Sequence, residues 1–158
     1  MVSQFALMFV TDQMAALKEM WRVLVPGGRL SVAVWWQSAG YPILADIARE
    51  RINGEVATAL MDPFCFGDGE ELVKLFQSSG IGTAKVHSHE GWGRFPSIDE
   101  FVRIEIKGWV DGQIEGGMDE DDYNALLVDA RMRLAHFRTR EGEAMIPMDA
   151  HIVTAEKN

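Results

Sequence analysis

Hydrophobic residues near the amino terminus recur with the period of an α-helix. Their positions are Leu17, Met20, Trp21 and Leu24. This i, i+3, i+4, i+7 spacing places them on one helical face, with charged residues on the other. Because Thr11 or Asp12 can cap the first turn, the pattern predicts a helix over about residues 12–24.

A proline and two glycines end this helix and precede an apolar run. Pro26 cannot continue a helix, and Gly27 and Gly28 reach backbone angles that other residues avoid. Residues 29–36, RLSVAVWW, show almost no polar alternation, which is typical of a strand covered on both faces. A buried helical segment is the alternative, but the glycines before the run and the valines within it favour a strand.

The rest of the chain alternates between helical and strand patterns. Two capping-box pairs mark helix starts, namely Asp68 with Glu71 and Ser97 with Glu100. The final strand tolerates Pro147 only at an edge or a bulge, and Trp109 to Gly117 is expected to be a loop. The predicted strands span about residues 29–36, 83–89 and 146–155, and the predicted helices about 12–24, 42–52, 69–79, 98–107 and 119–140. Together they predict an α/β fold with a small mixed sheet.

Composition narrows the class of protein. At 158 residues with 47% hydrophobic residues, the chain is expected to form a single domain, with a helical insertion over residues 92–141. The net charge of −9 and the scattered basic residues argue against nucleic acid as a partner. No apolar run approaches the ~20 residues of a membrane span, and no signal peptide opens the chain. The single cysteine, Cys65, fits a reducing, cytoplasmic location.

Metal-binding and hydrolytic patterns are weak. His87 and His89 share one strand face, which is a geometry for metal binding, but no third His or Cys lies near them in the sequence. The acidic run at residues 119–122 opens a helix, where the helix dipole favours carboxylates. Ser88 lacks a nucleophile elbow. We therefore predict no metal site and no hydrolase chemistry.

Three segments together resemble a known family. They are residues 4–12, QFALMFVTD; residues 16–30, ALKEMWRVLVPGGRL; and residues 148–155, MDAHIVTA. In this order they resemble the carboxyl-terminal half of class I S-adenosylmethionine-dependent methyltransferases, most closely those that methylate quinones and other small molecules. The resemblance implies a partial Rossmann-like fold and methyl transfer to a small metabolite.

The segments that resemble the family do not include the glycine-rich turn with which the family holds its cofactor. That turn follows a strand and precedes a helix. Gly27 and Gly28 follow a helix instead, and the glycine pair at 67 and 69 follows no strand. The pair at 91 and 93 lies among aromatic residues. The chain is therefore expected to be incomplete as an S-adenosylmethionine site when it is isolated.

The resemblance still assigns roles to individual positions. Gln4 and Phe5 correspond to residues beside the methionine portion of the cofactor, although Gln4 also fits a solvated terminal residue. The implied lining of the acceptor pocket is Phe9, Trp36, Phe64 and Trp92, for which core packing is the alternative. If a base assists methyl transfer, His89 is the candidate.

The strand at residues 29–36 expects a parallel neighbour, and only residues 2–8 can supply one. An exposed apolar edge pairs readily with another chain. We therefore expect a homodimer through this edge or through exchanged terminal elements, or else a second polypeptide that carries the missing half. The alternative to an enzyme is a non-catalytic oligomeric module that binds a small apolar ligand or a protein.

Overall fold

The computed structural model describes residues 1–110, 112 and 118–158. Its contacts divide the chain into two compact units. Unit 1 comprises Met1–Gln37, Pro63–Gly91 and Met148–Asn158, and unit 2 comprises Ser38–Asp62 and Trp92–Pro147. The predicted α/β class is confirmed, because helices accompany a mixed sheet. Within the described residues no helix has both the length and the apolar character of a membrane span.

The sheet of unit 1 has the strand order β1-β2-β5-β3. β1 (Val2–Gln4) pairs in parallel with β2 (Arg29–Ser38), and β3 (Lys85–His89) pairs antiparallel with β5 (Ala144–Glu156). The strands predicted at 29–36, 83–89 and 146–155 are thus confirmed. β1 supplies the parallel neighbour expected from residues 2–8, although with three residues it is too short to show a pattern of its own.

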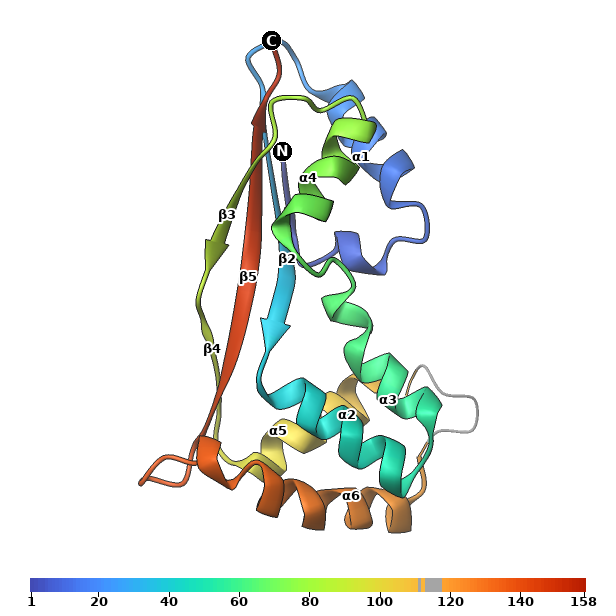
Figure 1. Cartoon of the computed structure of the whole chain (residues 1–158), viewed down its shortest axis with the longest axis vertical. Coiled ribbons are helices and arrows are strands. Elements are labelled where there is room, and N and C mark those ends of the chain that lie inside the picture. Colours follow the sequence, from blue (N-terminus) through green and yellow to red (C-terminus); the bar gives the residue numbers. More distant parts are fainter. Residues whose placement is uncertain (111, 113–117) are drawn as a thin grey trace. The chain divides into compact units, whose positions relative to one another are not determined.

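The helices of unit 1 cover one face of this sheet (Figure 1). They are α1 (Gln13–Val23) and α4 (Gly69–Ser78), preceded by the short 3₁₀ helix η1 (Leu7–Phe9). Asp12 caps α1 and Asp68 caps α4, as the sequence predicts. The buried core between helices and sheet consists of Leu7, Met8, Leu17, Leu30, Val32, Val34, Phe66, Leu72, Phe76, Ile81, Val153 and Ala155.

The turn between α1 and β2 explains the proline and glycines in the sequence. The Gly28 N–H donates to the Val25 carbonyl at 2.8 Å, which closes a four-residue turn. Gly27, third in that turn after Pro26, has a φ of 75°. A type II turn requires this left-handed conformation, which glycine adopts without steric cost.

Unit 2 is mainly helical. Its helices are α2 (Gly40–Arg51), α3 (Gly54–Met61), α5 (Ile98–Glu105), the π-helix η3 (Ile106–Val110), α6 (Glu120–Arg133) and the 3₁₀ helix η5 (Ala135–Phe137); η2 (Asp62–Phe64) follows α3. α2 packs against α3 and α6, and α5 packs against α6. The helices predicted at 42–52 and 98–107 are confirmed.

Unit 2 also departs from the prediction in three places. β4 (Trp92–Phe95) pairs antiparallel with the start of β5, so the region predicted as a helical insertion contains a strand. The helix predicted over 119–140 ends at Arg133, and the 3₁₀ helix η5 follows it. The predicted loop from Trp109 begins inside η3, and its residues 111 and 113–117 lie outside the described residues.

Pro147 lies inside β5, which begins three residues earlier, at Ala144. Pro147 stands opposite Trp92 of β4, and its carbonyl accepts a hydrogen bond from the Ala39 N–H at 3.3 Å. The next residue, Met148, donates its N–H to the Gly91 carbonyl at 2.9 Å, so backbone bonding of this strand continues past the proline.

Candidate functional site

The carboxyl end of the parallel pair β1 and β2 is the place where open α/β sheets bind ligands. Gln4, the last residue of β1, stands opposite Ala33 of β2. The next residue, Phe5, donates its N–H to the Ala33 carbonyl at 2.9 Å. Both residues that the resemblance assigns to the cofactor thus lie at the carboxyl end of β1.

Phe5 has an unusual backbone conformation. Its φ is 50°, and no other non-glycine residue in the described ranges has a positive φ. Its ring stacks on Trp35 with 3.9 Å between ring centroids and 16° between planes. An aromatic residue in the left-handed region carries strain that the surrounding structure must hold, and such strain clusters at functional sites.

A second cluster lies where β2 ends beside β5. Trp36 stacks on His151, with ring centroids 4.7 Å apart and planes 21° apart. The imidazole is 2% exposed, and its Nδ1 lies 3.0 Å from the Ser88 hydroxyl. A neutral ring with its proton on Nε2 accepts the Ser88 O–H at Nδ1.

Burial lowers the pKa of His151 below its ordinary value, because the charged imidazolium loses its hydration. The Gly67 carbonyl and the Asp68 carboxylate offset part of this change, but the buried Nε2 has no partner with hydrogen-bond geometry. Gly69 covers the ring, since a Cβ there would lie 3.6 Å from its Cε1. His151 is therefore a packed, neutral residue of the interior.

Sequence reasoning assigned no role to His151. Its position in the predicted final strand was the available signal, because alternation places it on the same face as Val153 and Ala155. The contact with Ser88 depends on the β3–β5 register, in which these two residues are partners. That register could not be read from the sequence.

The aromatic residues assigned to the acceptor pocket lie on four different elements. Phe9 in η1 is 50% exposed, and Phe64 in η2 is half-buried. Trp36 packs against His151, as described above. Trp92 is 63% exposed on β4, in unit 2. Their role in binding an acceptor stays a prediction.

His89 lies apart from the other assigned residues of unit 1. β1 and β3 are the outer strands of the sheet, so about three interstrand spacings, or ~14 Å, separate Gln4 from His89. Alternation along β3 puts His89 on the face of Lys85, whereas Trp36 lies on the helix-covered face. The structure therefore does not bring His89 to Gln4 or to Trp36.

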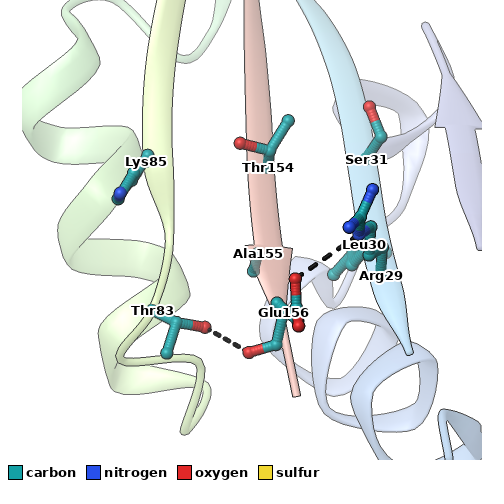
Figure 2. Close-up of a pocket in the computed structure, with 8 residues that line it drawn as sticks. All are labelled: Arg29, Leu30, Ser31, Thr83, Lys85, Thr154, Ala155 and Glu156. Carbon is teal, nitrogen blue, oxygen red and sulfur yellow. Dashed lines mark hydrogen bonds and ion pairs between the residues drawn. The ribbon is translucent and has the colours of Figure 1, made fainter. Parts of the chain in front are cut away.

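A cavity of about 590 Å³ lies at the other end of β2. Figure 2 shows Lys85, Thr154 and Ser31 on three adjacent strands, with the helices behind the sheet. Arg29 and Glu156 form an ion pair across it at 3.4 Å. Because it lies at the amino end of β2, this cavity is not the acceptor pocket that the resemblance implies.

Unit 2 holds a polar pair made of one buried and one half-buried side chain. Tyr41 of α2 is buried and hydrogen-bonded to the Glu105 carboxylate of α5. Burial raises the pKa of Glu105, and the hydroxyl of Tyr41 offsets part of that increase. Burial and the nearby Glu105 also raise the pKa of Tyr41. The Tyr41 hydroxyl, which keeps its proton, donates to the Glu105 carboxylate and so links α2 to α5.

The described residues fit an S-adenosylmethionine site only in part. Gln4 and Phe5 lie at the carboxyl end of β1, at the positions that the resemblance assigns to the cofactor, but no strand of the described residues leads into a glycine-rich turn. Within the same residues, no group of three or more His, Cys, Asp or Glu side chains is arranged to hold a metal ion.

The chain was compared with a family model and with curated proteins. The family model described as a methyltransferase domain matches residues 1–32, from β1 through α1 into β2. Among curated proteins, none matches this chain.

Solved structures resemble the chain at low sequence identity. Phosphoethanolamine N-methyltransferase 2 of Haemonchus contortus, in complex with phosphomonomethylethanolamine and S-adenosylhomocysteine, is 14% identical with a TM-score of 0.45. The YcgJ protein of Bacillus subtilis is 12% identical with a TM-score of 0.49. Each match covers 99% of this chain, which spans 32% of the first structure and 62% of the second. The match over residues 1–32 confirms the predicted resemblance to methyltransferases, here as a fragment of the domain.

Proposed function

We propose that this chain supplies the carboxyl-terminal half of an S-adenosylmethionine-dependent methyltransferase that acts on a small metabolite. The backbone of Phe5 carries the proposal. It is a strained residue at the carboxyl end of a parallel strand, at a position that the resemblance assigns to the cofactor. The methyltransferase-domain match includes this residue.

Gln4 and Phe5 have different roles in this proposal. The Gln4 side chain is exposed at the end of β1, where its amide can bond the polar methionine portion of S-adenosylmethionine. Phe5 fixes the direction in which the chain leaves the strand, because its ring is held against Trp35. The left-handed turn and the stack together keep Gln4 at the ligand-binding end.

The rest of the cofactor site comes, in this proposal, from a polypeptide that carries the glycine-rich half of the domain. β1 is the outer strand of the sheet and Val2 is 75% exposed, which leaves an edge that can pair with a further parallel strand. A second copy of this chain would not add a glycine-rich turn. A cytoplasmic location is part of the proposal, and the single cysteine supports it.

A nuclear magnetic resonance titration with S-adenosylhomocysteine tests the proposal. Half of a site loses much of the contact that offsets the cost of association, so we expect a Kd of about 1 mM or weaker. Backbone amide shifts should concentrate at Gln4, Phe5 and Trp35. Gln4→Ala should reduce them, while the matched control Gln77→Ala, at another exposed glutamine, should not.

Absence of shifts at saturating S-adenosylhomocysteine, or shifts confined to unit 2, would overturn the assignment of Gln4 and Phe5. Tight binding in the micromolar range would show that the chain needs no second polypeptide. Both results can be read from the same titration, because the first concerns which amides move and the second concerns the ligand concentration at which they move.

A further inference from the structure

α6 presents apolar side chains on two sides. Leu126 and Ala130 are buried against the rest of unit 2. On the outer side, Ala125 is exposed, Val128 is 54% exposed and Met132 is 66% exposed. Residues spaced by three and four positions share a helical face, so these three form one stripe. A surface helix ordinarily carries polar residues there, which makes the stripe unusual.

Charges flank this stripe in a self-complementary order. The first turn of α6 contains Glu120, Asp121 and Asp122, and the last turn contains Arg131 and Arg133. Two such helices packed antiparallel place the acidic turn of each against the basic turn of the other. The helix dipoles also align favourably in that arrangement, because opposite ends meet.

The charged groups at both ends retain capacity for a partner. Glu120 in the acidic turn binds Lys107, whereas Asp121 is exposed and has no ion-pair partner within the described residues. Arg131 uses its Nε and Nη2 to bind Asp99, at 2.8 and 2.6 Å, which leaves Nη1. Arg133 uses Nη1 to bind Glu50 at 3.1 Å. These bonds hold each guanidinium on the surface of α6 while other N–H groups remain available.

We propose that α6 is the interface of a symmetric homodimer, in which the stripe of Ala125, Val128 and Met132 packs antiparallel on its copy. A two-fold interface uses the same patch on both subunits, and this patch complements itself in charge and in apolar character. The surface differs from the β1 edge expected from the sequence and is independent of the proposed methyltransferase function.

The size of the helix limits the affinity. Its 14 residues span about 21 Å, so one helix pair buries less than the ~800 Å² per partner of a standard stable interface. We therefore expect a dissociation constant on the order of 10 µM. Dimerisation should depend on protein concentration over the range that sedimentation equilibrium covers.

Sedimentation equilibrium of the full chain tests the proposal. The wild type should be mostly dimeric at about 0.1 mM, ten times the expected Kd. Val128→Glu should raise the dissociation constant at least tenfold, because it places two like charges at the centre of the stripe. Val25→Glu is the matched control, since Val25 is 68% exposed in unit 1 and its change alters net charge equally. Circular dichroism verifies that each variant folds.

Disulfide trapping locates the interface. In a Cys65→Ser background, Val128→Cys should form an intermolecular disulfide on mild oxidation, because the centre of an antiparallel pair meets its own copy. Val25→Cys should not. A wild type that stays monomeric at about 0.1 mM overturns the proposal, as does a dimer that Val128→Glu leaves intact and Val128→Cys fails to trap.

Discussion

The ammonium group of Lys157 lies 2.7 Å from the backbone oxygen of Trp21, although 136 positions separate the two residues. The same group lies 2.7 Å from the Leu24 carbonyl and 5.9 Å from the centroid of the Trp21 ring. Both carbonyls lie at the carboxyl end of α1, where the last carbonyls of a helix lack i+4 partners, although that of Trp21 also accepts the Leu24 N–H at 3.3 Å. A lysine from beyond the end of β5 therefore caps α1 and neutralises the negative end of its dipole.

Lys157→Met should therefore destabilise unit 1. The change keeps most of the aliphatic stem but removes charge-assisted hydrogen bonds, so we expect a loss of about 1–3 kcal/mol in the free energy of unfolding. Urea denaturation followed by circular dichroism measures it. Lys18→Met, at an exposed lysine within α1, is the control and should change stability by less than about 0.5 kcal/mol. Equal losses in both variants would contradict the capping role.

Gly40 packs so closely against Ile146 that a larger residue would clash with it. A Cβ at this position would lie 2.6 Å from the Cγ2 of the fully buried Ile146. Gly40→Ala should therefore cost about 1–3 kcal/mol by overpacking. Gly54→Ala, also at the first position of a helix, meets nothing within 4 Å and should be neutral or slightly stabilising. Thermal unfolding of both variants tests the contrast, and Ile146→Ala in the Gly40→Ala background should relieve the clash.

Regular local patterns could be predicted from the sequence. The helical period around Leu17, the turn at Pro26 and the helix cap at Asp68 each depend on residues close in the chain, and each is present in the structure. The order of these segments was sufficient to indicate the methyltransferase resemblance, which the family model matches over residues 1–32.

Features that depend on distant pairing could not be predicted. β4 has four residues and includes Gly93, so its alternation is too brief to mark a strand, and it forms because the start of β5 pairs with it. The Trp36–His151 stack and the capping of α1 by Lys157 likewise need the register of strands far apart in sequence. The strain at Phe5 is a property of backbone geometry and has no residue signature.

Glu105→Gln should stabilise unit 2 at neutral pH. The pKa of Glu105 is raised in the folded state, so the folded protein binds its proton more tightly than the unfolded chain does. The stability that this group contributes is complete below the unfolded pKa of about 4.3 and is lost as pH rises through the folded value. Glutamine keeps an acceptor for the Tyr41 hydroxyl and removes the buried charge.

The gain should be about 1 kcal/mol at pH 7 and should shrink toward pH 4, where glutamate is protonated. Urea denaturation at several pH values measures the difference between variant and wild type. Glu141→Gln, at an exposed glutamate, is the matched control. A gain that does not change with pH would show that the buried charge of Glu105 is not its cause.

His151→Phe should remove part of the acid sensitivity of unit 1. The pKa of His151 is lowered in the folded state, so the unfolded chain binds a proton more readily. Its contribution is present above the unfolded pKa of about 6.5 and is lost as pH falls through the folded value. Phenylalanine keeps an aromatic ring against Trp36 and cannot be protonated, although it loses the bond to the Ser88 hydroxyl.

The measurement is urea denaturation between pH 7.5 and pH 5. At the higher pH the variant should be less stable than the wild type by about 1 kcal/mol, the typical value of one hydrogen bond. The wild type should then lose stability more steeply toward pH 5, so the two curves converge. Ser88→Ala separates the two effects, because it removes the hydrogen bond and leaves the titrating ring in place. Parallel pH curves for wild type and His151→Phe would show that folding does not lower the pKa of His151.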